Sequence, residues 1–91
     1  MKSMYRVRLA RRAERGLRRI RQGDPRGYGR IVVAIESLAE DPLPSGTTKL
    51  TSFDPPAWRL RVGEYRIVYE IHEDELVVIV VNVAPRGEVY R

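Results

Sequence analysis

Residues 58–69 alternate apolar and polar side chains on both sides of a Gly63-Glu64 pair, and this run constrains the fold more than any other part of the chain. An alternation with a period of two is typical of a strand with one buried face. A glycine at position 63 suits the first central position of a two-residue hairpin turn, where the backbone needs a positive φ. The run therefore predicts an antiparallel hairpin in which Val62 pairs with Tyr65 and the register continues outward to residues 58 and 69.

The predicted hairpin has one arginine face and one apolar face. Arg61 and Arg66 would pair directly across the hairpin, where two like charges repel each other. A polyanion lying across Arg59, Arg61 and Arg66 would relieve this repulsion, so we predict an anion-binding surface. The alternative is that these arginines occupy ordinary solvated strand positions. The opposite face requires burial and consists of Trp58, Leu60, Val62, Tyr65, Ile67 and Tyr69.

Periodicity and capping signals predict the remaining elements. Gly23 suits the end of one helix, and Asp24 followed by Pro25 suits the start of the next. Two helices with so short a link are expected to form an antiparallel hairpin. The run at 76–83 is nearly all apolar and β-branched, which is typical of a central strand buried on both faces. The N-terminal half is predicted to form a strand at 4–9, a helix at 10–22 and a second helix that begins at 25 and ends before Pro42. A short strand at 47–51, the two hairpin strands and the strand at 76–83 follow, and residues 84–87 end the last strand.

These elements predict an α+β fold in a single domain that spans residues 1–91. The expected architecture is a small antiparallel β-sheet of three to four strands plus the N-terminal strand. The N-terminal helical hairpin is expected to pack on one face of this sheet. The arginines of the central hairpin then lie on the helix-free face.

Composition excludes several classes of site. The chain has no cysteine, so it has neither a disulfide framework nor a thiolate metal site, and with a single histidine we expect no metal and no cofactor. That histidine, His72, falls in a predicted polar turn remote from the arginines and is interpreted as a surface residue. No segment has the apolar length of a membrane span or the core of a signal peptide, so we expect a cytoplasmic protein without a membrane partner.

The charge is strongly positive and unevenly distributed. The formal net charge is +5 and the sequence pI is about 10.1, which points to an anionic partner. Residues 1–30 contain eleven of the seventeen Lys and Arg residues but only Glu14 and Asp24 as acids, so this segment carries 11 − 2 = +9. Fifteen of the seventeen cationic residues are arginine. The planar guanidinium group of arginine can donate two parallel hydrogen bonds to one phosphate.

Four segments together resemble the RelE/ParE toxin superfamily of bacterial toxin–antitoxin systems. They are Leu38-Ala39-Glu40-Asp41-Pro42, Trp58-Arg59-Leu60-Arg61-Val62-Gly63-Glu64-Tyr65-Arg66-Ile67-Val68-Tyr69, Val81-Asn82-Val83-Ala84-Pro85-Arg86, and Glu88-Val89-Tyr90-Arg91. The single position Leu50 also matches. The resemblance implies a small antiparallel sheet with two helices on one side. It also implies one of two activities, because RelE-like members cut mRNA in the ribosomal A site whereas ParE-like members act on DNA gyrase.

The resemblance to RelE-type members also implies roles for individual residues. The predicted catalytic set is Arg61, Arg66, Arg86 and Tyr90, and Arg59 is predicted to bind RNA. Arginine stabilises the charged phosphorane formed when the 2′-OH of RNA attacks the adjacent phosphate. Tyr90 would act as the base or stack on a nucleobase. The alternatives are that Arg86 is an ordinary surface residue and that Tyr90 covers the sheet edge.

Two departures from the family pattern leave the identity of the general base open. Ala57 stands where some RelE-type enzymes have a lysine. Ala84-Pro85-Arg86 stands in place of a commoner Gly-His-Arg. The first helix adds a further set of candidates, which either form a solvated face or contact rRNA phosphates: Arg11, Arg12, Arg15, Arg18 and Arg19.

The expected function is therefore that of a toxin that inhibits translation as a ribosome-dependent mRNA endoribonuclease. One alternative is a ParE-like, non-catalytic inhibitor of DNA gyrase. The other is an inactive toxin that serves with its antitoxin as a repressor complex. The expected partners are a cognate acidic antitoxin, partly disordered when free, the ribosome and mRNA, with a higher-order complex on operator DNA formed through the antitoxin.

Overall fold

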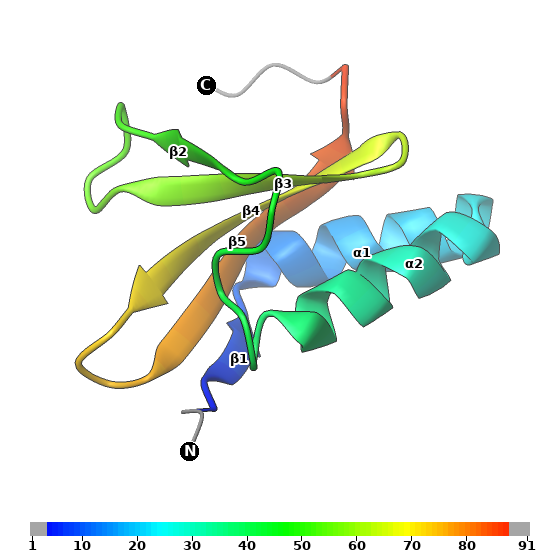
Figure 1. Cartoon of the computed structure of the whole chain (residues 1–91). Helices are drawn as coiled ribbons and strands as arrows, with labels where there is room; N and C mark the ends of the chain where they lie inside the picture. The colour runs from blue at the N-terminus through cyan, green and yellow to red at the C-terminus, as the bar shows by residue number, and fades with distance from the viewer. Residues whose placement is uncertain (1–3, 88–91) are drawn as a thin grey trace.

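The computed structural model describes residues 4–87 as a five-stranded sheet with two helices packed against one side (Figure 1). The predicted α+β architecture is confirmed. Neither helix within this range has both the length and the apolar character of a membrane span. In chain order the elements are β1 (Arg6–Leu9), α1 (Arg11–Gly23), α2 (Pro25–Ser37), β2 (Thr48–Leu50), β3 (Ala57–Val62), β4 (Tyr65–His72) and β5 (Val77–Pro85).

The hairpin of β3 and β4 has the predicted register. Val62 pairs with Tyr65, Arg61 with Arg66, and the ladder continues to residues 58 and 69. Gly63 has a φ of +58°, the left-handed conformation that glycine adopts most easily. The local turn chemistry thus fixes which side chains share a face.

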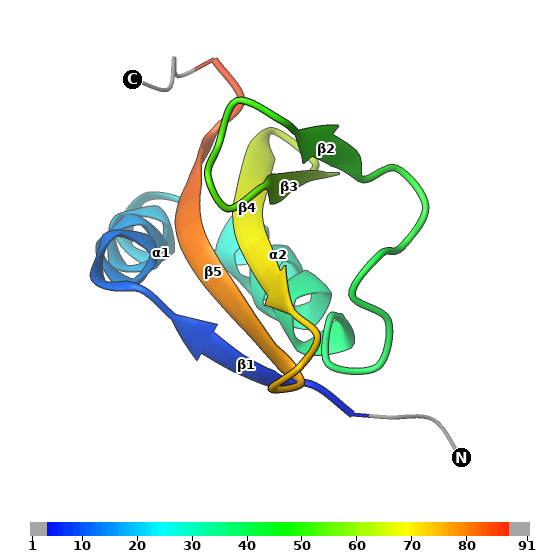
Figure 2. The ribbon, with the colours of Figure 1, turned by 90° about the vertical axis from the view of Figure 1, so that its left-hand side faces the viewer.

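The strands lie in the order β1-β5-β4-β3-β2, and Figure 2 shows how the sheet twists. Neighbouring strands are antiparallel except for β1, which runs parallel to β5. The sheet is therefore mixed, whereas the sequence predicted an antiparallel one. β1 and β5 lie at opposite ends of the chain, so no tight turn forces them to be antiparallel.

Strand β5 is longer than predicted. Ala84 pairs with Arg66 and Pro85 with Tyr65, so the predicted break at Ala84 is wrong. Proline is tolerated here because it is the last residue of the strand. The extension carries β5 to the tip of the β3–β4 hairpin.

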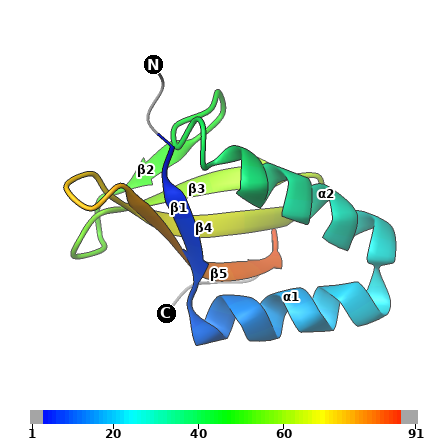
Figure 3. The same ribbon diagram turned by 90° about the horizontal axis from the view of Figure 1, so that it is seen from below.

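Both helices pack on the same side of the sheet (Figure 3). The predicted N-cap is present, since Oδ1 of Asp24 accepts a hydrogen bond from the N–H of Gly27 at 3.1 Å and Pro25 is the first residue of α2. The core comprises Ala13, Leu17 and Ile20 from α1, Ile31, Ile35 and Leu38 from the second helical segment, and Ile67, Tyr69, Val78, Val80 and Val83 from the sheet.

Helix α1 also lies alongside β5, beyond the end of β1 (Figure 2). β1 pairs with β5 only as far as Val80. Farther along, the two backbones come so close that a Cβ on Gly16 would lie 2.3 Å from the carbonyl oxygen of Val83. The absence of a side chain at position 16 permits this approach, although glycine is a poor helix former.

Candidate nucleic-acid interface

The three arginines of the hairpin lie on the helix-free face of the sheet, as predicted. Their alternation with the core residues Ile67 and Tyr69 places Arg59, Arg61 and Arg66 opposite the helices. Within residues 4–87, neither Arg59 nor Arg61 forms an ion pair. We call these three residues the arginine face.

An apolar floor supports this face. Val68 is 1% exposed although it points away from the helices. Its neighbours on the same face are the half-buried Arg59 across the hairpin and Arg66 two residues earlier in β4. Arginine commonly lays its aliphatic stem over apolar surface and keeps its guanidinium in water. Packing of this kind would cover Val68, and Nε of Arg66 is itself buried.

Arg66 and Arg86, both predicted as catalytic, meet at the tip of the hairpin. Nη2 of Arg66 donates a hydrogen bond to the carbonyl oxygen of Arg86. The N–H of Arg86 in turn donates to the carbonyl oxygen of Glu64 at 2.8 Å. These two bonds attach the end of β5 to the hairpin, and the side chain of Arg86 is exposed beside it. The remaining predicted catalytic residue, Tyr90, lies outside the described residues.

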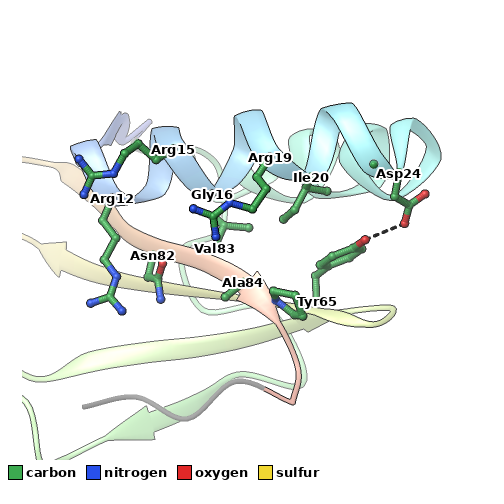
Figure 4. Close-up of a pocket in the computed structure, with 12 residues that line it drawn as sticks. Arg12, Arg15, Gly16, Arg19, Ile20, Asp24, Tyr65, Asn82, Val83 and Ala84 are labelled. Carbon is green, nitrogen blue, oxygen red and sulfur yellow. Dashed lines mark hydrogen bonds between the residues drawn. The ribbon is translucent and has the colours of Figure 1, made fainter.

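The predicted helix arginines divide into two groups. Arg12, Arg15 and Arg19 line a groove of about 530 Å³ between α1 and β5 (Figure 4), whereas Arg11 and Arg18 do not. On the opposite wall are the β5 residues 82–85. We call this the α1–β5 groove.

A hydrogen-bonded pair closes one end of the groove. The hydroxyl of Tyr65 donates to Oδ2 of Asp24 at 2.8 Å. The pKa of Asp24 is lowered, first by the hydrogen bond from the N–H of Gly27 and then by that of Tyr65. The pKa of Tyr65 is raised, because its hydroxyl donates to the carboxylate. A tyrosine with a raised pKa is a poor base, so Tyr65 is a structural residue that links α2 to the hairpin tip.

His72 is the last residue of β4, although it was expected to open the following turn. Its Nε2 lies 2.9 Å from Oε1 of Glu70. Arg66 lies six positions earlier in the strand, a distance of about 20 Å at the usual rise per residue. His72 is therefore too far from Arg66 to act on the same phosphate.

Asn82 is a candidate that the sequence interpretation missed. It is the one polar residue of β5, and it is only 7% exposed. It lines the α1–β5 groove. A lone carboxamide in an otherwise apolar strand was the available signal, since a buried polar group needs a partner.

Comparisons with known proteins agree with this architecture. The family model described as the ParE toxin of the type II toxin–antitoxin system parDE matches residues 7–90. No curated protein sequence matches the chain significantly.

Several solved structures have the same fold. The archaeal RelE–RelB complex from Pyrococcus horikoshii OT3 contains a chain that superposes with a TM-score of 0.76 at 25% identity, covering 94% of this chain and 99% of that one. For the toxin–antitoxin complex RelBE2 from Mycobacterium tuberculosis the TM-score is 0.74 at 26% identity, with coverages of 93% and 94%. The isolated E. coli RelE toxin gives 0.74 at 21% identity, with coverages of 93% and 87%, which shows likeness of fold alone.

Proposed function

We propose that this chain, which belongs to the ParE toxin family within the RelE/ParE superfamily of type II toxin–antitoxin systems, inhibits translation by cutting mRNA on the ribosome. The observation that carries this proposal is the arginine face. Three guanidinium groups and the loop of Arg86 gather at one end of the sheet, and Arg59 and Arg61 have no acidic partner in residues 4–87. Such a cluster suits a phosphodiester.

The arrangement suggests how cleavage proceeds. The 2′-OH of the nucleotide loses its proton to a base and attacks the adjacent phosphorus, and the 5′ oxygen leaves with a proton. Arg61 and Arg66 stabilise the phosphorane, in which negative charge builds up, and Arg59 binds the neighbouring backbone. Arg86 supplies a further cation at the hairpin tip. Tyr90 is proposed as the base or as a stacking platform.

We also propose a cognate antitoxin as partner, since similar chains occur in complexes of RelE with RelB. The net charge of +5 favours an acidic antitoxin that covers the basic surface. In this proposal the free toxin binds the ribosome and mRNA, and the toxin–antitoxin complex reaches operator DNA through the antitoxin.

The proposal is tested by mapping mRNA 5′ ends in a cell-free translation reaction. Wild-type protein should generate new ends in ribosome-bound mRNA. Arg61→Ala should slow their appearance by about 10²-fold, a typical loss for one charge-stabilising donor. Arg61 is exposed, so its removal should leave the melting temperature unchanged. Arg26→Ala, which removes the same charge from exposed α2, is the matched control. If Arg61→Ala and Arg26→Ala cut mRNA at the same rate, the arginine face has no catalytic role.

Gyrase inhibition is the second candidate, and the match to the ParE family model favours it. A supercoiling assay with purified gyrase and relaxed plasmid separates the two activities. Inhibition of supercoiling without new mRNA ends selects the gyrase function. New mRNA ends without an effect on supercoiling select the nuclease.

A further inference from the structure

The α1–β5 groove combines a row of cations with a wall of sheet backbone (Figure 4). Arg12, Arg15 and Arg19 are spaced so that they share one side of the helix. Between the first and the last of them the helix rises about 10 Å. All three are exposed, and none forms an ion pair within the part of the chain that the structure describes. The row is therefore available to an external anion of some length.

Asn82 provides a second, independent feature of the groove. It is 93% buried, yet its carboxamide forms no hydrogen bond in residues 4–87. Its polar atoms still reach the solvent in the groove, so they are open to a ligand there. The carboxamide carries both donors and an acceptor, so a ligand that pairs with it fully should offer the complementary pair. A simple anion cannot do so, because it only accepts.

Two residues of the groove lie on the same side of the sheet as the arginine face. Asn82 pairs with Val68 in the β4–β5 ladder, and Ala84 pairs with Arg66, so both β5 residues lie on the helix-free side. Ala84 lies directly across from Arg66, and Asn82 lies two residues before Ala84 on the same face of β5. One extended polymer bound to the protein can therefore run from the arginine face into the groove without crossing a helix.

These features favour a nucleotide as the ligand. A nucleobase edge offers adjacent donors and acceptors that match a carboxamide, and single-stranded RNA presents such edges unpaired. The phosphates of the RNA backbone recur at regular intervals and can each bind one arginine of the row. An acidic peptide also matches the arginines, but it has no reason to continue onto the proposed phosphodiester site.

We propose that the α1–β5 groove is a specificity subsite for single-stranded RNA. In this subsite Asn82 hydrogen-bonds the edge of one base next to the cleaved position. Arg12, Arg15 and Arg19 bind the phosphates that follow. The proposal deepens the nuclease function and rests on it, but the binding of RNA by the groove is measurable without cleavage.

The base contact is tested on the sequence preference of cleavage. Asn82→Asp keeps the shape of the side chain but replaces its donor with an acceptor. This substitution should change the preferred base at one position relative to the cut, and Asn82→Ala should abolish the preference there. In each variant the ratio of cleavage rates between the preferred base and the other bases should change by about tenfold or more. Preferences at the other positions should remain. An unchanged preference in both variants, with melting temperatures equal to wild type, would overturn the role of Asn82.

The phosphate contacts are tested by fluorescence anisotropy with a short, labelled single-stranded RNA and the free toxin. Arg15→Ala should weaken binding about three- to tenfold and lower the slope of log affinity against log salt by about 0.7. Arg26→Ala, a charge-matched substitution outside the groove, should leave the slope within error of wild type. Equal losses in both variants would mean that net charge alone attracts RNA, and would overturn the proposal.

The same assay separates this proposal from the proposed function. Tight, Arg15-dependent RNA binding by a toxin that cuts no mRNA would support the groove and refute the nuclease. Cleavage that does not depend on Arg15 or Asn82 would support the nuclease and refute the groove. If an acidic Glu-rich peptide binds in an Arg15-dependent manner while the RNA does not, the groove is a protein-docking site and the RNA proposal fails.

Discussion

Gly16 lines the α1–β5 groove at a point where α1 lies directly against the backbone of β5. A Cβ there would lie 2.3 Å from the carbonyl oxygen of Val83, and that oxygen belongs to backbone, which cannot move aside easily. We predict that Gly16→Ala lowers the free energy of unfolding by about 1–3 kcal/mol through overpacking, although alanine is the better helix former. Urea denaturation followed by circular dichroism measures this change.

Gly29 provides the control for that substitution. It lies within α2 and is exposed, and a Cβ added to it would meet no atom within 4 Å in the part of the chain that the structure describes. Gly29→Ala should therefore stabilise the protein by about 0.5–1 kcal/mol, the ordinary difference in helix propensity. If Gly16→Ala stabilised the protein to the same extent, α1 would not be held against β5 as closely as the structure indicates.

Asp24 makes stability depend on pH in the acid range. Its carboxylate caps α2 and accepts the hydroxyl of Tyr65, and both bonds lower its pKa below the ordinary 3.8. A carboxyl group with a lowered pKa in the folded state stabilises the protein above its unfolded pKa and loses this effect as pH falls through the folded value. We predict that the melting temperature of wild type falls more steeply below about pH 4 than that of Asp24→Asn, which keeps a capping side chain. Parallel curves for the two proteins would exclude Asp24 as the titrating group.

At the scale of elements, the β3–β4 hairpin was fully predictable because its information is local. The alternation of residues 58–69 and the turn at Gly63 fixed both register and faces. The helix boundary at Asp24-Pro25 was equally local. The arginine face followed directly from this register.

Non-local features escaped prediction. The parallel pairing of β1 with β5 joins segments about 70 residues apart, and no short-range signal encodes its direction. Proline usually breaks a strand, yet the end of β5 is held by the tip of the hairpin through the hydrogen bond from the N–H of Arg86 to the carbonyl oxygen of Glu64. The division of the helix arginines into a groove set and an outer set likewise depends on where α1 meets β5. Periodicity along α1 alone does not reveal that contact.

At the scale of the whole molecule, charge is segregated along the chain and in space. Residues 1–30 carry +9, so the remainder carries 5 − 9 = −4. The positive segment forms β1, α1 and the start of α2. The acidic Glu73–Glu75 turn joins β4 to β5 at the end of the sheet far from the arginine face. Such a distribution orients an approaching polyanion before contact.

This segregation makes association with the proposed acidic antitoxin sensitive to salt. Long-range attraction between exposed charges is screened within about 10 Å at 0.1 M salt and within about 3 Å at 1 M. We predict that the association rate constant falls by about tenfold or more between 0.05 and 0.5 M NaCl, while the dissociation rate constant changes much less, since contacts made after docking are shielded from the solvent. Biolayer interferometry with the immobilised toxin and the proposed cognate antitoxin measures both constants. A repeat in which Arg12, Arg15 and Arg19 are replaced by alanine should show a shallower salt dependence. Association that is independent of salt in the wild type would mean that apolar contacts, and not the basic surface, guide the antitoxin to this fold.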